Sequence, residues 1–237
     1  MLFDLDGTLL HIDTARFVEA YTRLLATWFA RWIPPDAFVS HLLAATWKMT
    51  ENRDPERTNK QVFDEAFYAA VGMSAEAMAP HLAEFYAREF PKLRELAAPP
   101  DPAAREAVSI VLAHGLAAVI ATHPIFPSVA IHARMEWAGI ADLPFALVTS
   151  YETSHFSKPH PEYFQEVATS IRFDPRDCLF VGNDMIEDTA ARQVGMQTYL
   201  VTDHLSNRSR LQAGAGPMGM LKVLPGFLAG FLGRATV

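Results

Sequence analysis

The second half of the chain alternates between short apolar segments and helix-like segments, and this alternation limits the possible folds more than any other feature. The apolar segments are LAAVIAT, FALVTS, CLFVGND and QTYLVT, within residues 116–202. Apolar residues recur at helical spacing between them, at 127–139, 161–171 and 185–195. Strands that alternate with helices form a parallel sheet with right-handed crossovers. We therefore expect a Rossmann-like α/β sheet with helices on both faces.

An all-helical insertion is expected directly after the first strand, which residues 1–5 form. Apolar residues recur at helical spacing between residues 14 and 97, with Asp13 and Ser74 as predicted N-caps and Gly72 as a predicted helix end. The segment AAPPDP then closes the helical region. The sequence thus predicts an α/β core of residues 1–13 and 98–237, with a helical domain of residues 14–97 inserted into it.

Composition excludes several classes of protein. Half of the 237 residues are apolar and 20% are charged, which suits a sizeable core and argues against disorder. The net charge of −7 gives no electrostatic footprint for nucleic acid or an anionic membrane. No secretory signal and no run of 18 apolar residues is present, so we expect a cytoplasmic protein without a membrane partner. The apolar tail at 220–232 is expected to pack on the core.

Several other patterns are assigned structural roles. The single cysteine, Cys178, is expected to be a small buried residue. The segment GAGPMG at 214–219 matches G-x-G-x-x-G, but no strand precedes it, so a nucleotide site is rejected. The aromatic residues of the insertion are expected to form its core, and the histidines near the motif loops to be polar loop residues. These are Trp28, Phe29, Trp32 and Trp47, and His11, His155 and His160.

Polar side chains occur where four of the predicted strands end. Asp4 and Asp6 end the first strand and Thr122 ends the second. Lys158 lies in the loop after the third, and the fourth ends in Asn183-Asp184. Ligands of open parallel sheets bind beyond the carboxyl ends of the strands, so these side chains are expected to converge there.

A fourth acid is expected in the same crevice. Asp188 lies four residues after Asp184, and residues at this spacing share a face of a helix. Carboxylates this close destabilise a fold unless a cation neutralises them, and Mg²⁺ accepts carboxylates, waters and phosphate oxygens as ligands. A site in which a metal, a lysine and a hydroxyl group surround a carboxylate is typical of phosphoryl transfer. One carboxylate can be the nucleophile and a second the acid and base.

These motifs together resemble the haloacid dehalogenase (HAD) superfamily. The resemblance rests on FDLDGTL, an apolar strand that ends in Thr122, Lys158-Pro159, and GND followed by ED. It covers residues 1–13 and about 98–203, and the helical insertion matches a cap domain in type and position only.

The resemblance implies a role for each motif residue. Asp4 is the nucleophile and a metal ligand, and Asp6 is the general acid/base whose carbonyl also contacts the metal. Lys158 neutralises the nucleophile and the phosphate, and Thr122 holds the phosphoryl oxygens. Asp184 binds the metal. The supporting residues are Thr8 at the turn, Asn183 beside Asp184, and Asp188 with Glu187 behind the metal.

Three features of the motifs qualify this picture. His123 follows Thr122 where many relatives have asparagine or glycine, and it either contacts the substrate or shapes the loop. Family dehalogenases lack an aspartate at the position of Asp6, so dehalogenation is not expected. Only Met1–Phe3 precede Asp4, whereas strands usually have about 5–6 residues, so we expect the native chain to extend upstream.

The predicted function is a Mg²⁺-dependent phosphomonoesterase that acts through an aspartyl phosphate on a small phosphorylated metabolite. Two alternatives stay open at this point. One is a phosphomutase or phosphotransferase on the same scaffold, and the other is a phosphate-binding regulatory protein without turnover. The identity of the substrate and the oligomeric state cannot be derived from the sequence.

Overall fold

The centre of the molecule is a parallel sheet. The computed structural model describes residues 1–210 and 216–235, and within them six strands follow the order β3-β2-β1-β4-β5-β6. The strands are β1 (Leu2–Phe3), β2 (Val119–Ile120), β3 (Leu147–Val148), β4 (Leu179–Gly182), β5 (Gln197–Val201) and β6 (Met218–Gly219). All neighbouring pairs are parallel, and β1 lies between β2 and β4. The predicted α/β fold is confirmed.

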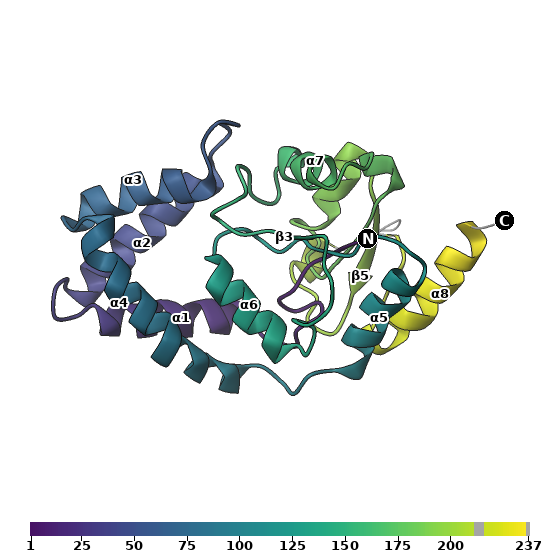
Figure 1. Ribbon diagram of the computed structural model, residues 1–237, viewed down its shortest axis with the longest axis horizontal. Coiled ribbons are helices and arrows are strands. Elements are labelled where there is room, and N and C mark those ends of the chain that lie inside the picture. Colours follow the sequence, from purple (N-terminus) through teal and green to yellow (C-terminus); the bar gives the residue numbers. More distant parts are fainter. Residues whose placement is uncertain (211–215, 236–237) are drawn as a thin grey trace.

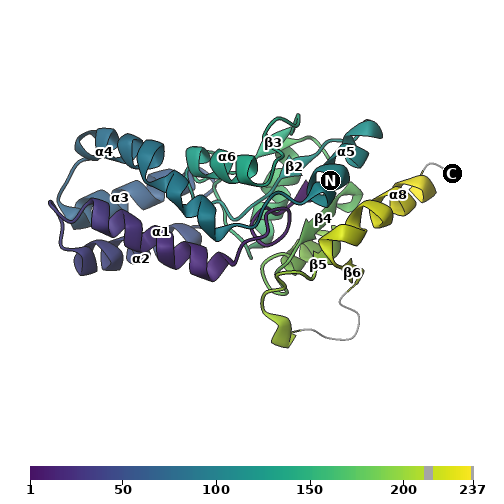
Figure 2. The ribbon, with the colours of Figure 1, turned by 90° about the horizontal axis from the view of Figure 1, so that it is seen from below.

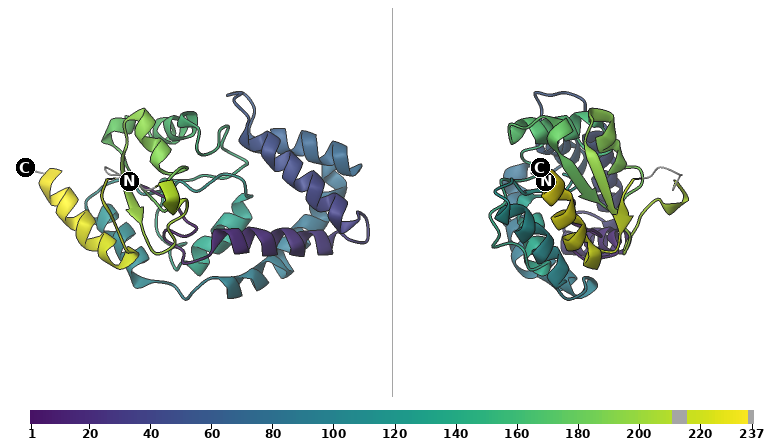
Figure 3. Two further views of the ribbon diagram at one scale, coloured as in Figure 1. Left: turned by 180° about the vertical axis from the view of Figure 1, so that it is seen from behind. Right: turned by 90° about the vertical axis from the view of Figure 1, so that its right-hand side faces the viewer.

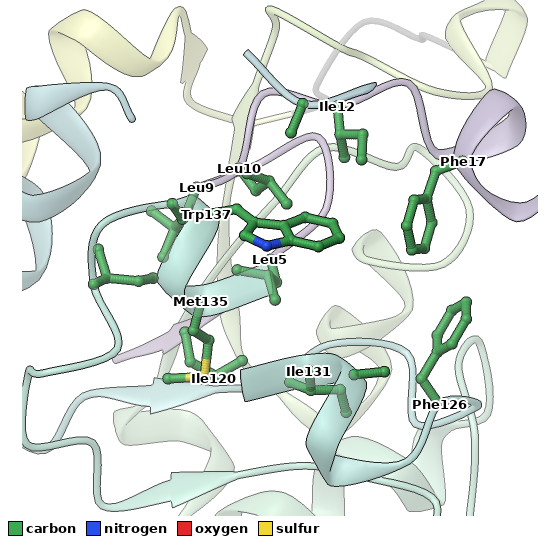
Figure 4. Packing of buried hydrophobic residues seen from close by; sticks show 14 of the residues in the cluster. Leu5, Leu9, Leu10, Ile12, Phe17, Ile120, Phe126, Ile131, Met135 and Trp137 are labelled. Atoms are coloured by element: carbon green, nitrogen blue, oxygen red, sulfur yellow. The ribbon is translucent and has the colours of Figure 1, made fainter. Parts of the chain in front are cut away.

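Helices cover both faces of this sheet (Figures 1 and 2). They are α5 (Pro102–Ala113), α6 (Ser128–Trp137), α7 (Pro161–Ser170), α8 (Leu224–Ala235) and the 3₁₀ helix η3 (Thr189–Val194). Successive strand residues point to opposite faces. Phe3 therefore joins the cluster that contains residues of α5, α6 and α8, whereas Leu2 joins the cluster with α7 and η3. Figure 4 shows Ile131 and Met135 of α6 beside Ile120 of β2.

The insertion, called the cap below, consists of helices at one end of the molecule (Figure 1). They are α1 (Thr14–Trp28), α2 (Pro35–Thr50), α3 (Asn59–Val71), α4 (Ala75–Arg88) and the 3₁₀ helix η1 (Phe90–Leu96). The predicted caps are confirmed, because the side chains of Asp13 and Ser74 accept hydrogen bonds from the backbone of their helices. Gly72 ends α3 with a φ of 68°, a conformation that favours glycine. The domain boundaries at 13/14 and 97/98 stay predictions.

The prediction for the aromatic residues of the cap is correct for Phe29 but wrong for two tryptophans. Phe29 is fully buried and stacks on Phe38 at a centroid distance of 5.4 Å. Trp47 is 65% exposed and Trp32 is 36% exposed. Trp47 therefore contributes little to the cap core, whereas Trp32 lies at its edge against Phe29 and His81.

The cap lies against α6 of the core, where Phe17 and Phe90 contact Trp137, and backbone hydrogen bonds join it to the core at two further places (Figure 3). At the covalent connection, the Ala98 N–H donates to the carbonyl of His11 at 2.9 Å, and the His11 ring lies 3.0 Å from an Asp101 oxygen. At the other place, the start of α3 meets the loop after β3. The Asn59 N–H donates to the carbonyl of Ser154 at 2.8 Å. The cap is therefore held over the carboxyl end of the sheet from two sides.

The predicted helix at 185–195 is wrong. Only Thr189–Val194 are helical, as a 3₁₀ helix. The reason is tertiary, since the Asp188 carboxylate accepts hydrogen bonds from the N–H groups of Asn183 and Asp184 and pulls the preceding residues into a turn.

The other structural expectations had different outcomes. Leu224, Leu228 and Leu232 of the tail are buried against the core, and Cys178 is buried, as predicted. The GAGPMG segment lies partly outside the described residues, and the upstream extension stays a prediction. In the described part of the chain, no helix is long and apolar enough to cross a membrane.

Candidate active site

A pocket of about 270 Å³ lies at the carboxyl ends of the central strands. The predicted residues that line it are Asp4, Asp6, Thr122, His123, Lys158, Asn183, Asp184, Glu187 and Asp188. Val18 of α1 closes it from the cap side. The structure thus brings the predicted residues together around one pocket, except Thr8, which lies behind Asp4.

The turn after β1 holds Asp4 against the loop after β4. Gly7 has a φ of 77°, and a Cβ there would lie 2.3 Å from the Asn183 amide nitrogen, so only glycine fits. The Thr8 hydroxyl lies 3.2 Å from Asp4 Oδ2 and 3.0 Å from Asn183 Oδ1. Thr8 therefore supports the turn, as predicted, and links it to the loop after β4.

Lys158 is the central cation of the pocket. Its ammonium group donates to Asp4 Oδ1 at 2.9 Å and to Asp188 Oδ1 at 2.7 Å, and its side chain is 1% exposed. Burial alone would lower the pKa of Lys158, but the carboxylates of Asp188 and Asp4 raise it well above its ordinary value. Lys158 therefore stays charged across the physiological pH range.

Asp4 is the acid with a raised pKa. Burial raises the pKa of Asp4 to about 7, Lys158 opposes this shift, and the negative charges of Asp188 and Asp6 add to it. Positive charge that enters the pocket would favour the ionised form, which is the form that a nucleophile requires.

Asp188 organises the loop after β4 from behind. Its Oδ2 accepts the N–H of Asn183 at 2.8 Å and that of Asp184 at 2.9 Å, while Oδ1 holds Lys158. A Cβ on Gly182 would lie 2.2 Å from Asp188 Oδ2, so a side chain there would displace the carboxylate. Asp188 thus positions both Lys158 and the Asn183-Asp184 backbone.

Asp184 and Asp188 line the same pocket, but the residues between them form a turn and not the predicted helix. Asp184 Oδ1 accepts the N–H groups of Ile186 and Glu187 at 2.7 and 2.8 Å. The amide of Asn207 contacts both carboxylate oxygens, at 2.9 and 2.7 Å. Asn207 is a contact of the site that sequence reasoning missed.

The carboxylate oxygens of Asp4 and Asp184 are suitable ligands for Mg²⁺, although the described residues do not form a complete set of protein ligands around one point. Among the described residues, no three histidine, cysteine or acidic side chains are grouped closely enough to hold a metal. A Mg²⁺ site of the phosphoryl-transfer type needs only one or two carboxylates, because waters and phosphate oxygens complete its shell. Asp4 and Asp184 line the same pocket and meet this requirement.

His123 and Glu187 form a pair at the wall of the pocket. His123 Nδ1 lies 3.1 Å from Glu187 Oε2. Burial would raise the pKa of Glu187, but the neighbouring His123 and Lys158 hold it below its ordinary value. Within the described chain, the buried Nε2 of His123 has no hydrogen-bond partner. His123 lines the pocket, and its contact with a substrate stays a prediction.

The structure adds one buried cation that sequence reasoning missed. Arg134 of α6 is fully buried, and its Nη1 pairs with Asp6 Oδ2. Its Nε donates to the carbonyl of Ala130 at 3.1 Å, and its guanidinium lies 4.3 Å from the centroid of the Phe126 ring. The one signal in the sequence is that Arg134 has apolar residues three and four positions away on both sides.

Comparison with known proteins agrees with this geometry. The haloacid dehalogenase-like hydrolase family matches residues 1–195 of the sequence. The chain belongs to the haloacid dehalogenase-like hydrolases. The HAD resemblance seen in the motifs is therefore confirmed, and the protein is a hydrolase of this family. No curated protein matches the sequence.

Solved structures with different activities share the fold of this HAD hydrolase. They include a 2-haloacid dehalogenase from Pseudomonas syringae pv. tomato DC3000 with 22% identity and a TM-score of 0.60. A HAD phosphatase from Thermococcus onnurineus has 16% identity and a TM-score of 0.58. A putative β-phosphoglucomutase from Thermotoga maritima has 20% identity and a TM-score of 0.56. Each alignment covers 97% of both chains. At these identities the likeness shows the fold alone.

Proposed function

We propose that this HAD hydrolase is a Mg²⁺-dependent phosphomonoesterase that acts through an aspartyl phosphate on Asp4. One observation carries the proposal. Lys158 Nζ lies 2.9 Å from Asp4 Oδ1, while Asp6 lines the same pocket and its Oδ1 has no partner among the described residues. A nucleophile, a cation and a second carboxyl group are the side chains that a two-step phosphoryl transfer requires.

In the first step, an Asp4 carboxylate oxygen attacks phosphorus and the bond to the ester oxygen breaks. The leaving alcohol takes its proton from Asp6. Lys158 stays beside Asp4 and balances the negative charge of the transferred group. The products of this step are an alcohol and an aspartyl phosphate on Asp4.

In the second step, water attacks the phosphorus of the aspartyl phosphate. Asp6, now ionised, accepts the proton of the water, and the bond between phosphorus and the Asp4 oxygen breaks. Inorganic phosphate leaves, and Asp4 and Asp6 return to their starting states. The cap, which packs against the core, keeps bulk water from the pocket during both steps.

Mg²⁺ would be held by Asp4, by Asp184 and by the backbone carbonyl of Asp6. When bound, it supplies positive charge that favours the ionised form of Asp4 and offsets the charge of the phosphoryl oxygens.

The test measures phosphate release from a panel of phosphomonoesters, and halide release from 2-chloropropionate, for wild type, Asp4→Asn and Asp6→Asn. We expect the wild-type protein to release phosphate. Asp4→Asn should reduce the rate of release to below a few per cent of the wild-type rate. Asp6→Asn should slow both the departure of the alcohol and the hydrolysis of the phosphoenzyme. Halide release without phosphate release contradicts the proposal. Transfer of the phosphoryl group to a second organic molecule favours the phosphomutase alternative, and binding of phosphate analogues without turnover favours the regulatory one.

A further inference from the structure

The cap contains an apolar cavity of about 110 Å³ beside the catalytic pocket. Side chains from α1 to α4 and from the loop after β2 line it, among them Leu42, Phe67, Met78 and Ile125. No charged side chain is part of this lining in the described residues. The cavity therefore differs in character from the catalytic pocket, which carries five carboxyl groups and a lysine.

Three of the six hydroxyl groups that line the cavity are engaged with one another or with their own helix. The hydroxyls of Tyr21 and Tyr86 lie 2.8 Å apart, and Thr46 Oγ1 donates to the carbonyl of Leu42 at 2.8 Å. Burial raises the pKa of Tyr21 to about 12, so this side chain is neutral at physiological pH. A second phosphate, a carboxylate or an amine would find no counter-charge here. Among the described residues, only the hydroxyls of Thr22, Tyr68 and Tyr151 are left to pair with a ligand, too few for all the hydroxyl groups of a sugar, so a sugar would lose water without a full set of partners.

The cap cavity and the catalytic pocket share part of their walls. Val18, Ile125 and Phe126 line both. A wider groove of about 910 Å³ runs along α1 and α2 to Asp184 and Asn207, and Val18 lines it as well. An ester whose phosphorus lies at Asp4 thus has two directions for its alcohol group, an apolar cavity or an open groove.

We infer that the cap cavity binds the leaving group of the substrate and that this group is apolar, an aryl ring or a branched alkyl group of about one ring in size. This inference rests on the proposed phosphomonoesterase activity. The size follows from comparison, since an apolar cavity of roughly 150 Å³ in another protein binds benzene. The neutral lining selects against sugar phosphates and nucleotides, whose polar groups would occupy it.

The test compares phosphate release from benzyl phosphate, methyl phosphate and glycerol 3-phosphate. All three are monoesters of primary alcohols, so the bond that breaks is the same and the substituent differs. One methylene in an apolar pocket changes kcat/KM by about 10- to 200-fold. We therefore expect kcat/KM for benzyl phosphate to exceed that for either other ester by at least about 100-fold.

Two variants narrow the cavity from different helices, Thr46→Phe on α2 and Thr22→Leu on α1. Each should lower the ratio of kcat/KM for benzyl phosphate to kcat/KM for methyl phosphate by about 10-fold or more. Thr50→Leu is the matched control, because Thr50 also bonds to a carbonyl of α2 but does not line the cavity. It should leave the ratio unchanged.

Binding of the product separates this inference from the proposed function. Benzyl alcohol binding is measured by NMR line broadening in wild type and in Thr46→Phe. If benzyl alcohol binds and Thr46→Phe weakens binding while no ester is hydrolysed, the phosphomonoesterase proposal fails and the apolar site stands. The inference is overturned if glycerol 3-phosphate is turned over as well as benzyl phosphate, if narrowing leaves the ratio unchanged, or if benzyl alcohol does not bind.

Discussion

Arg134 and Asp6 form a buried ion pair between residues 128 positions apart in the sequence. Each keeps one atom without a partner within the described chain, Nη2 of Arg134 and Oδ1 of Asp6. The guanidinium thus holds one oxygen of the proposed acid/base and leaves the other free for the leaving group. Because Arg134 does not line the catalytic pocket, we propose that it acts as a positioning residue through Asp6.

The first prediction is that Arg134→Met lowers kcat by about 100-fold with little change in KM, because Asp6 loses its orientation while Asp4 and Lys158 still bind the phosphate. Removing one partner of a buried pair also costs about 3–5 kcal/mol of stability. Arg134→Lys should restore part of kcat through its charge, but not all, because lysine lacks the planar fork. The measurements are kcat and KM for phosphate release and urea unfolding. Full activity in Arg134→Met would show that Asp6 is oriented by other contacts.

The convergence of the motif residues on one pocket could be predicted because it depends on the order of the strands. Asp4, Lys158 and Asp184 follow three different strands of a parallel sheet, so their convergence follows from the alternation of strands and helices. Arg134 could not be found in this way, because an arginine in a helix usually lies at the surface and its burial depends on Asp6, far away in the sequence. The prediction of a helix in the segment before Asp188, which forms a turn, failed for a similar reason. Its carboxylate binds backbone groups and Lys158, and these contacts override local helix preference.

The second prediction concerns the pH dependence of stability without metal. The pKa of Asp4 is raised to about 7 in the folded protein from an ordinary value of 3.8. The folded protein therefore binds the Asp4 proton more tightly than the unfolded chain does. This preference stabilises the fold fully below about pH 4, and the contribution is lost as the pH rises through 7. The asparagine side chain in Asp4→Asn carries no charge at any pH. In EDTA, the Tm of Asp4→Asn relative to wild type should therefore rise between pH 5 and pH 8.

The control for this experiment is Asp142→Asn. Asp142 is an exposed carboxylate whose pKa its hydrogen bond to Arg105 lowers to about 2, so it is ionised in both states across the range tested. The difference in Tm between Asp142→Asn and wild type should stay constant from pH 5 to pH 8. A constant difference for Asp4→Asn as well would contradict the raised pKa of Asp4.

The third prediction is that Asp188→Asn impairs both catalysis and stability. Its carboxylate holds Lys158 and two backbone N–H groups, and an amide can replace only part of these contacts because its NH₂ group repels the ammonium. We expect kcat/KM to fall by about 100-fold and stability to fall by about 3 kcal/mol. Glu187→Gln is the comparison, since Glu187 pairs with His123 at the half-buried wall and its loss should change kcat/KM by less than about 10-fold. Equal effects of the two variants would remove the positioning role of Asp188.

The fourth prediction distinguishes Asp184 from its partner Asn207 in the proposed Mg²⁺ site. Asp184→Asn removes the charge of a ligand and should weaken Mg²⁺ binding by at least about 10-fold, measured by isothermal titration calorimetry. Asn207→Ala removes the amide that occupies both Asp184 oxygens and should leave Mg²⁺ binding as tight as in wild type or tighter. Weaker binding in Asn207→Ala would mean that the amide orients Asp184 for the ion and does not compete with it.

The last prediction concerns Asn59, which joins the cap to both catalytic loops. Its fully buried Nδ2 lies 3.2 Å from the carbonyl of Pro124, beside His123, and 3.2 Å from the hydroxyl of Ser157, beside Lys158. Asn59→Ala leaves these buried acceptors without a donor, which costs about 1–3 kcal/mol, and loosens the closed cap. We expect kcat/KM to fall by about 10- to 100-fold and limited proteolysis of the loop at 51–58 to accelerate. Gln61→Ala removes a capping contact of the same helix without touching the core, so it should destabilise α3 yet leave kcat/KM within about 3-fold. Similar losses of activity in both variants would mean that intact α3, and not the bridge through Asn59, supports the catalytic loops.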